Sequence, residues 1–147
     1  LLSNIKKDRF ERKPEKATEI GVTKIVPVVT TRTERGVVDP RRAYRIMTEA
    51  SEQCGRGNVP HYSESISIHD AVTTPTVVMC DSTGISATDY FREHTESCAI
   101  LIGPEGGFTT EEMKLCEDAH VPVLSFGQQT LRADTAAIVA ATFALLK

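Results

Sequence analysis

The most informative stretch of this 147-residue chain is Ile100-Leu101-Ile102-Gly103-Pro104-Glu105-Gly106-Gly107-Phe108-Thr109-Thr110-Glu111-Glu112. Its first three residues are an apolar run typical of a β-strand, and the glycines around one proline indicate a tight turn. Thr109, with Glu112 three residues later, forms a capping-box pattern that predicts a helix start. Backbone without side chains, next to the free N–H groups of a helix start, suits a nucleotide-like ligand. An ordinary strand-to-helix connection would show the same pattern.

A second glycine-bearing turn lies near the C-terminus. The predicted strand 121–125 runs into Phe126-Gly127-Gln128-Gln129-Thr130-Leu131-Arg132-Ala133-Asp134, and an almost wholly apolar helix then continues to Leu146. A helix that is apolar on every side must be covered by the sheet and by further protein, such as a second subunit. Arg132 and Asp134 at its entrance are candidates for chemistry. The alternative is that Asp134 caps the helix and Arg132 is its ion-pair partner.

Composition indicates a single globular domain. Hydrophobic residues make up 40% of the chain and charged residues 25%, and the length permits a sizeable core. No apolar run approaches the ~20 residues of a membrane-spanning helix, and the charged segment from Leu1 to Lys16 does not resemble a signal peptide. We therefore expect a cytoplasmic protein without a membrane partner.

The cysteines and histidines show no metal-binding pattern. No two cysteines form a C-x-x-C pair, and no two histidines are four residues apart. We expect reduced thiols, no disulfide framework and no metal. The residues concerned are Cys54, Cys80, Cys98, Cys116, His61, His69, His94 and His120.

Charge is distributed unevenly along the chain. Residues 1–56 hold 13 of the 17 Lys and Arg against 8 acids, a net charge of +5, whereas residues 57–147 hold 4 against 12, a net charge of −8. The basic N-terminal third suits an anionic partner such as RNA, and Arg32, Arg35 and Arg56 are candidate phosphate contacts. A solvated charged surface is the alternative explanation.

Strand-like and helix-like segments alternate along the chain. Helices are predicted at 14–21, 40–54, 67–72, 88–95 and 110–119, and extended segments at 24–30, 60–63, 76–80, 100–102 and 121–125. Pro27 predicts an edge position or an early end for its strand. This alternation indicates an α/β domain with a mainly parallel sheet, whose ligand site lies at the carboxyl ends of strands. Both glycine-bearing turns follow such ends, so the residues predict a nucleotide-like pocket.

Four motifs resemble those of one known family. Ile102-Gly103-Pro104-Glu105-Gly106-Gly107-Phe108 and Leu131-Arg132-Ala133-Asp134-Thr135-Ala136 are similar to the motif pair of the E-type small-subunit ribosomal RNA methyltransferases, which methylate N3 of a uridine in 16S RNA. Lys16-Ala17-Thr18-Glu19-Ile20-Gly21-Val22 and Glu49-Ala50-Ser51-Glu52-Gln53-Cys54-Gly55-Arg56 resemble that family's earlier signatures.

The resemblance implies a SPOUT-class fold: a mainly parallel sheet flanked by helices, with a deep C-terminal trefoil knot, in an obligate homodimer. General rules of chain topology would have argued against a knot. The resemblance also implies S-adenosylmethionine bound in the knot. The implied cofactor-binding residues are Ile102, Gly103, Pro104, Glu105, Gly106, Gly107, Leu124, Phe126, Gly127, Thr130 and Leu131.

The same resemblance implies methyl transfer to small-subunit ribosomal RNA. Attack by uracil N3 requires a base, or a cation that stabilises charge on the carbonyl oxygens. We expect Arg132 to be that cation, and Asp134 to orient it or to accept a proton. Methyl transfer itself requires no metal.

Two departures from the family pattern stand out. The family usually has Glu where this chain has Asp134, and a displacement of ~1 Å can cost on the order of 100-fold in rate if that carboxylate positions a reacting group. Family members also carry an N-terminal RNA-binding β-barrel. We expect residues 1–15 to be the remnant of the linker from that missing barrel and residues 16–147 to be the methyltransferase domain.

Two alternatives belong to other functional classes. The first is a catalytically weakened RNA-binding module of the same fold. The second is an α/β protein that binds a phosphate-bearing nucleotide at the turn 103–107. The absence of the Lys-Ser/Thr pair of a phosphate loop from this turn counts against the second alternative.

Overall fold

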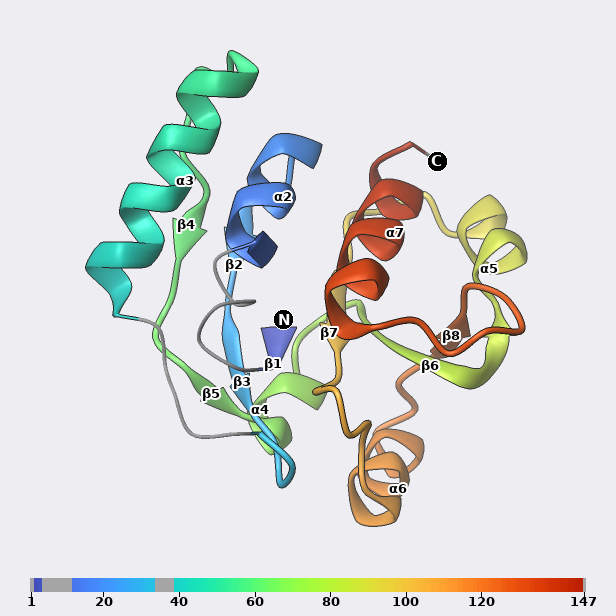
Figure 1. Ribbon diagram of the computed structural model, residues 1–147. Helices are drawn as coiled ribbons and strands as arrows, with labels where there is room; N and C mark the ends of the chain where they lie inside the picture. The colour runs from blue at the N-terminus through green and yellow to red at the C-terminus, as the bar shows by residue number, and fades with distance from the viewer. Residues whose placement is uncertain (1, 4–11, 34–38, 147) are drawn as a thin grey trace.

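A parallel β-sheet forms the middle layer of the molecule in the computed structural model, which describes residues 2–3, 12–33 and 39–146 (Figure 1). Within these ranges the sheet has six strands, and all of its pairings are parallel. Their order is β5 (Ile66–Ser67), β3 (Pro27–Val29), β1 (Leu2–Ser3), β7 (Ala99–Ile102), β6 (Val77–Ser86) and β8 (Val123–Ser125). A separate parallel pair joins β2 (Lys24–Ile25) to β4 (His61–Tyr62).

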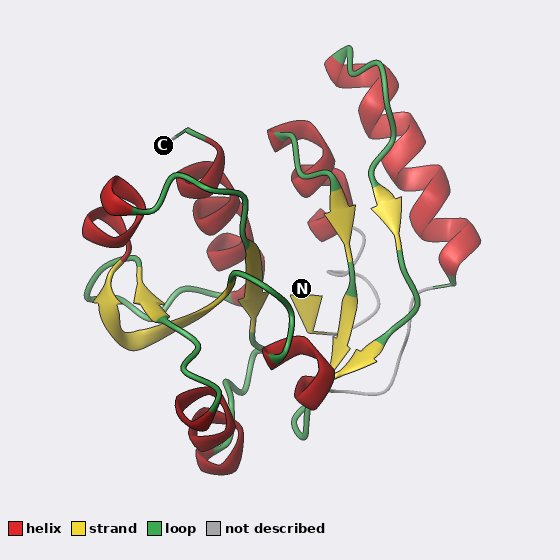
Figure 2. Cartoon of the chain, turned by 180° about the vertical axis from the view of Figure 1, so that it is seen from behind, coloured by secondary structure: helices red, strands yellow, loops and turns green. Residues whose placement is uncertain are grey.

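Helices cover both faces of the sheet, as Figures 1 and 2 show. One face carries α2 (Arg12–Ile20), α3 (Pro40–Cys54), α5 (Ala87–Glu93) and α7 (Ala133–Leu145). The other face carries α4 (Ile68–Val72) and α6 (Thr110–Asp118). The predicted α/β class with a parallel sheet flanked by helices is therefore confirmed.

Alternation along the central strands separates the two core layers. In β6, Val77 and Met79 pack toward α4 and α6, while Val78 packs toward α5. In β7, Leu101 joins the first layer and Ile102 packs with α3 and α7 on the opposite face. Successive side chains of a strand point to opposite faces, so continuous apolar runs are needed where both faces are covered.

The predicted helix boundaries hold where capping residues mark them. The side chain of Asp39 accepts a hydrogen bond from Arg41 N–H at the start of α3, and Gly55 ends that helix in the left-handed conformation. Thr109 and Glu112 form the predicted capping box of α6. Capping satisfies backbone N–H groups that the first turn of a helix leaves without partners.

Three strand predictions required correction. Pro27 does not occupy an edge, because it is the first residue of β3, which lies between β5 and β1. The predicted early strand end is confirmed, since the expected strand 24–30 is interrupted after Ile25 and divides into β2 and β3. The first position of a strand tolerates a residue without an N–H. β5 was not predicted, since it is only two residues long. β6 continues from Cys80 to Ser86 beyond its predicted end, and there it pairs with β8 past an irregularity.

The N-terminal residues also contribute to the sheet. β1 pairs with β3 and β7, and α2 begins at Arg12. The boundary predicted between residues 15 and 16 stays a prediction. Among the described residues, no helix combines the length and the apolar character that crossing a membrane requires.

The close approach of β6 to β8 leads to a prediction at Gly84. A Cβ atom at this position would clash with the carbonyl oxygen of Val123, which is backbone and cannot move independently. We expect Gly84→Ala to lower the free energy of unfolding by ~1–3 kcal/mol, as overpacked sites do. The matched control is Gly57→Ala, since no heavy atom lies within 4 Å of a Cβ there.

Urea denaturation of the two variants and the wild type measures both effects. Gly57→Ala should change stability by less than ~0.5 kcal/mol, as surface substitutions usually do. Equal stability of Gly84→Ala and Gly57→Ala would contradict the contact between these strands.

Candidate functional site

The turn after β7 folds back on itself. Gly107 N–H donates a hydrogen bond to the carbonyl of Pro104 at 2.9 Å, and Gly107 has a φ of 69°, which favours glycine. The ring of Phe108 lies over Gly103, where a Cβ atom would come within 2.8 Å of the ring. The backbone conformation of the turn thus requires glycine at position 107, and the ring of Phe108 favours glycine at position 103.

Glu112 anchors the end of this turn in the protein. Its side chain is buried, with 4% of the residue exposed, and both carboxylate oxygens accept backbone hydrogen bonds. Thr109 N–H donates to one oxygen at 2.9 Å, and Thr31 N–H donates to the other at 2.7 Å. The capping box of α6 is therefore tied to the turn that follows β3.

Arg32 contacts the same glycine-rich turn from the side. Its Nη1 donates to the carbonyl oxygens of Gly106 and Phe108, the latter at 3.4 Å. Arg32 was predicted to contact RNA phosphate. In the folded chain its guanidinium group meets the backbone of the turn.

The two glycine-bearing turns and the middle of β6 line one cavity of about 380 Å³. The cavity lies at the carboxyl ends of β7 and β8, where parallel α/β sheets bind ligands. Its lining residues are Cys80, Asp81, Ser82, Ile102, Gly103, Pro104, Glu105, Gly107, Phe108, Leu124, Ser125, Phe126, Gly127, Gln129, Thr130, Leu131, Arg132, Ala133 and Ala136. We call it the β7–β8 cavity.

The structure brings most of the predicted cofactor residues together. The residues that line the β7–β8 cavity are Ile102, Gly103, Pro104, Glu105, Gly107, Leu124, Phe126, Gly127, Thr130 and Leu131. Gly106 does not line it, because its carbonyl and Cα face Arg32 instead. The roles of all these residues in cofactor binding stay predictions.

Sequence reasoning missed the contribution of β6 to this cavity. Cys80, Asp81 and Ser82 line it because β6 lies between β7 and β8. The order of strands in a sheet is a tertiary property, so periodicity gave no signal for these residues. A candidate signal was the polar Asp81-Ser82 pair directly after an apolar strand.

The charges around the β7–β8 cavity are two carboxylates and one guanidinium group. Asp81 and Glu105 supply the carboxylates and Arg132 the cation. Asp81 Oδ1 accepts hydrogen bonds from the N–H of Thr83 at 3.0 Å and from its hydroxyl at 2.8 Å, which fixes that carboxylate. Burial raises the pKa of the Cys80 thiol to about 12, so this cysteine is a neutral thiol and not a nucleophile.

The two predicted catalytic residues face different spaces. Arg132 lines the β7–β8 cavity, whereas Asp134 lines a neighbouring cavity of about 160 Å³ between α2 and α7. Lys13 and Lys16 share that second space with Asp134. Among the described residues no ion pair joins Arg132 to Asp134, and Arg132 is the N-cap residue of α7 without a side-chain cap. The ion-pair part of the alternative is therefore wrong. Asp134 Oδ1 does accept a hydrogen bond from Thr135 N–H at 2.9 Å in the first turn of α7, so the carboxylate acts on the helix start.

Lys13 is a buried cation that the sequence did not single out. Only 3% of the residue is exposed. Burial lowers the pKa of its ammonium group from 10.5 to about 8, and the nearby charges of Asp134 and Glu105 partly offset this effect. Lys13 thus lies between the entrance of α7 and the glycine-rich turn.

The other predicted RNA contacts have different surroundings. Arg56 donates to the carbonyl oxygens of Thr18 at 2.7 Å and Val22 at 3.0 Å, and to Asn58 Oδ1 through Nε and Nη2. It thereby joins the end of α3 to the end of α2. Arg35 lies outside the described residues, and phosphate contact by any of these arginines stays a prediction.

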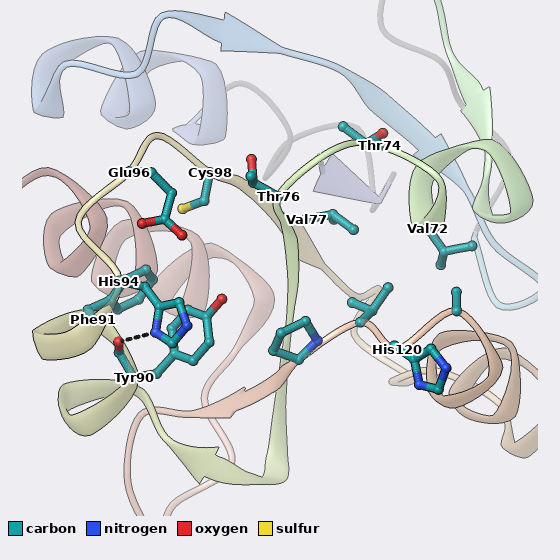
Figure 3. Close-up of a pocket in the computed structure, with 13 residues that line it drawn as sticks. Val72, Thr74, Thr76, Val77, Tyr90, Phe91, His94, Glu96, Cys98 and His120 are labelled. Carbon is teal, nitrogen blue, oxygen red and sulfur yellow. Dashed lines mark hydrogen bonds between the residues drawn. The ribbon is translucent and has the colours of Figure 1, made fainter.

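A further cavity of about 280 Å³ lies at the opposite edge of the sheet (Figure 3). It is bordered by Val77 at the start of β6 and by the rings of Tyr90 and His94, which stack with centroids 4.0 Å apart. The amino ends of parallel strands are not where α/β sheets bind ligands. The described residues include no group of three or more His, Cys, Asp or Glu that would hold a metal ion.

Comparison with known sequences identifies the family. The sequence model described as "RNA methyltransferase domain" matches residues 1–145. The chain belongs to this RNA methyltransferase family.

Two curated relatives of this methyltransferase domain are named Ribosomal RNA small subunit methyltransferase E. The protein from Rickettsia conorii is 30% identical over 148 residues, which cover 92% of this chain and 59% of that protein. The protein from Synechocystis sp. is 30% identical over 147 residues, which cover 89% of this chain and 47% of that protein. The chain spans about half the length of these relatives, and the predicted family resemblance is confirmed.

Solved structures of methyltransferases share the fold. A Legionella pneumophila protein described as a methyltransferase in complex with bound SAM has a TM-score of 0.87 and 27% identity, covering 99% of this chain and 64% of that one. The Neisseria gonorrhoeae Ribosomal RNA small subunit methyltransferase E, bound to S-adenosyl methionine, has a TM-score of 0.81 and 30% identity. The match covers 95% of this chain and 62% of that one. The SpoU methyltransferase AviRb of Streptomyces viridochromogenes shares the fold at 19% identity, with a TM-score of 0.63.

Burial of Lys13 predicts how stability depends on pH. Between its folded-state pKa of about 8 and its ordinary value of 10.5, the unfolded chain binds a proton that the folded chain does not. The free energy of unfolding should therefore rise as pH increases through this interval. At 1.36 kcal/mol per pKa unit, the gain from pH 8 to pH 9.5 is about 2 kcal/mol.

Urea denaturation of wild type and Lys13→Met, from pH 7.5 to pH 9.5, isolates this contribution. The variant should lack the rise. Lys16→Met is the control, because hydrogen bonds to Glu15 and Glu19 raise the pKa of Lys16 above 10.5, so this residue is protonated in both the folded and the unfolded chain over this pH range and adds no pH dependence. If the free energy of unfolding changed with pH equally in wild type and Lys13→Met, the burial of the Lys13 ammonium group would be contradicted.

Proposed function

We propose that this chain is an S-adenosylmethionine-dependent methyltransferase domain that acts on N3 of a uridine in 16S ribosomal RNA of the small subunit. The observation that carries the proposal is the β7–β8 cavity, which two glycine-bearing turns build at the carboxyl ends of neighbouring parallel strands. Relatives of known structure that share this fold were solved with bound S-adenosylmethionine.

The residues of the β7–β8 cavity fit S-adenosylmethionine in their chemistry. The volume of about 380 Å³ falls in the range of small-molecule sites. Apolar side chains such as Leu124 and Leu131 suit an adenine ring and a methyl group. The carboxylates of Asp81 and Glu105 suit a cationic ligand and ribose hydroxyls, and backbone near Gly103 can approach a ligand closely.

Bound S-adenosylmethionine supplies an electrophilic methyl group on a sulfonium. Transfer of that methyl group to N3 of uracil would break the sulfur–methyl bond, and the N3 proton would pass to a base. The chain's task is to align the reacting atoms and exclude water. Arg132 is the proposed cation that stabilises charge on the uracil carbonyl oxygens, because its side chain lines the cavity.

Asp134 is retained as the second proposed catalytic residue. Its carboxylate lies in the neighbouring cavity with Lys13. Acceptance of a proton by Asp134 therefore depends on the charge of the buried Lys13 ammonium group. The family's usual Glu is one methylene longer. We keep charge stabilisation for Arg132 and proton acceptance for Asp134 as proposals, although Asp134 in this single chain faces the neighbouring cavity and not the β7–β8 cavity.

RNA binding is assigned to the basic N-terminal third. Residues 1–56 carry a net charge of +5, and Arg32, Arg35 and Arg56 are the proposed phosphate contacts. The division into a linker at 1–15 and a methyltransferase domain at 16–147 belongs to the same proposal. A ribosomal substrate places the reaction in the cytoplasm.

A trefoil knot and a homodimer complete the proposal. The knot is proposed on the motif resemblance to SPOUT-class methyltransferases. α7 supports the homodimer, because it is almost wholly apolar and yet exposes Ile138, Phe143, Leu145 and, just beyond it, Leu146. Exposed apolar surface of this kind marks interaction sites. A non-catalytic RNA-binding module is not favoured, since the β7–β8 cavity is formed.

Cofactor binding and turnover test the proposed activity. We expect the chain to bind S-adenosylmethionine but not adenosine triphosphate in calorimetric titrations. Arg132→Ala should lose on the order of 100-fold or more in methyl transfer to small ribosomal subunits while keeping cofactor affinity within a few-fold, because the guanidinium acts on developing charge.

Mass spectrometry of the RNA identifies the methylated position. Methyl groups at N3 of uridine support the proposal. Loss of cofactor affinity in Arg132→Ala would move this residue from the chemistry to the binding of the cofactor, and methylation at another base atom would refute the proposed reaction.

Light scattering tests the dimer. Wild type should have twice the 16.1 kDa mass of one chain. Leu146→Glu should shift the mass toward that of a monomer, because Leu146 is 81% exposed beside α7 and a charge there would be buried in the interface. Tyr44→Glu, at an exposed position on α3, is the control and should leave the mass unchanged. A monomeric wild type would refute the dimer.

A further inference from the structure

We propose that Arg32 is a positioning residue, which holds the glycine-rich turn after β7 in the shape that the β7–β8 cavity requires. This inference rests on the proposed function, since it assigns Arg32 to the cofactor site. The residue acts on the backbone of the turn and not on the reacting atoms. Its contribution is separate from any phosphate contact made by the basic N-terminal third.

The peptide group between Gly106 and Gly107 is held from two sides. The carbonyl oxygen of Gly106 accepts a hydrogen bond from Arg32 Nη1. The N–H of Gly107, in the same peptide group, donates to the carbonyl of Pro104 at 2.9 Å. Glycine at φ 69° gives this peptide group little restraint of its own. Removal of the Arg32 hydrogen bond would therefore leave its orientation to a single contact within the turn.

Arg32 projects from a turn that is itself fixed by hydrogen bonds. The hydroxyl of Thr33 accepts a hydrogen bond from Thr30 N–H at 2.8 Å, and Thr33 N–H donates to the carbonyl of Thr30 at 3.1 Å. Thr31 N–H donates to buried Glu112 at 2.7 Å. Neighbours on both sides of Arg32 are thus tied, one of them to the helix that the glycine-rich turn precedes. The Arg32 side chain therefore starts from a fixed backbone and can hold the glycine-rich turn in a fixed place.

The side chain of Arg32 also packs closely against Gly106. A Cβ atom at Gly106 would lie 3.3 Å from Arg32 Cδ and 3.7 Å from its Cβ. The side chain of Arg32 therefore covers the outer side of the turn, while Gly103 and Gly107 line the cavity on the inner side. This arrangement explains why Gly106, unlike the other predicted cofactor-binding residues, does not line the cavity.

The expected consequence is a loss of preorganisation. Hydrogen bonds from a charged group are stronger than neutral ones, and a turn without them must be ordered when the cofactor binds. We expect Arg32→Ala to weaken S-adenosylmethionine binding by about 10-fold. Turnover at saturating cofactor should fall much less, because the bound turn regains its shape; KM for the cofactor therefore rises more than kcat falls.

The experiment compares Arg32→Ala, Arg32→Gln and Arg32→Lys, with Arg41→Ala as a matched control at an exposed arginine on α3. Calorimetry gives cofactor affinity, thermal unfolding reports global stability, and amide hydrogen exchange reports the Gly107 N–H without any cofactor. Gln keeps a donor but no charge, whereas Lys keeps the charge but loses the planar group with several donors.

Two results would support the positioning role. Gly107 exchange should accelerate by about 10-fold in Arg32→Ala, and the loss of cofactor affinity should be smaller in Arg32→Gln than in Arg32→Ala. Arg41→Ala should change neither quantity. An effect of Arg32→Ala on RNA affinity that Arg32→Lys fully restores, with unchanged Gly107 exchange and cofactor affinity, would overturn the proposal in favour of phosphate contact.

The outcomes separate this inference from the proposed function. If wild type does not bind S-adenosylmethionine, the proposed function fails, and Gly107 exchange alone then decides whether Arg32 holds the turn. Unchanged exchange would overturn the inference. All three Arg32 variants could unfold at a lower temperature than Arg41→Ala and yet keep the wild-type exchange rate of Gly107 N–H, measured well below the unfolding temperature. Arg32 would then support the fold in general, and the inference would also fail.

Discussion

The carboxylate of Glu112 is the contact on which the site depends. A charge that is 96% removed from solvent must be compensated, and here two backbone N–H groups and the start of α6 compensate it. The N–H groups belong to Thr109 and Thr31, which are far apart in sequence. One side chain therefore fixes the distance between the turn after β3 and the turn after β7. Loss of this carboxylate would leave two buried N–H groups without partners and would release both turns.

The parallel sheet converts this anchor into a cavity. β7 and β8 both pair with β6, so the turns that follow them lie at the same edge of the sheet. Residues from the turn 103–107 and the segment 124–132 then share one space, although they are about 20 residues apart. α7 closes it through Arg132, Ala133 and Ala136. The position of the site is thus a property of the topology, and its chemistry is a property of a few side chains.

Local sequence patterns predicted the elements with clear capping or turn chemistry. The capping box at Thr109 and the helix start at Asp39 depend on residues within one turn of the chain, so periodicity and spacing were sufficient. Strand order is different, because the placement of β6 between β7 and β8 depends on packing across the whole sheet. For this reason the contribution of Asp81 to the cavity was missed.

The side-chain environments also required the folded structure. Arg132 and Asp134 are two residues apart in sequence, yet they line separate cavities, since the first turn of α7 directs them differently. Lys13 lies outside every motif that the sequence displayed, and it is buried where α2 packs against α7. Charge counting placed Arg32 with the RNA contacts, whereas its hydrogen bonds join it to the glycine-rich turn.

The most direct test of this account is the location of the cofactor. Nuclear magnetic resonance can follow backbone amide signals of the 147-residue chain during titration with S-adenosylmethionine. The account predicts that signals from 103–107 and 124–131 shift together, while Thr76 and His120, at the cavity on the opposite edge of the sheet, do not. Shifts confined to that opposite cavity, or none at saturating cofactor, would contradict it.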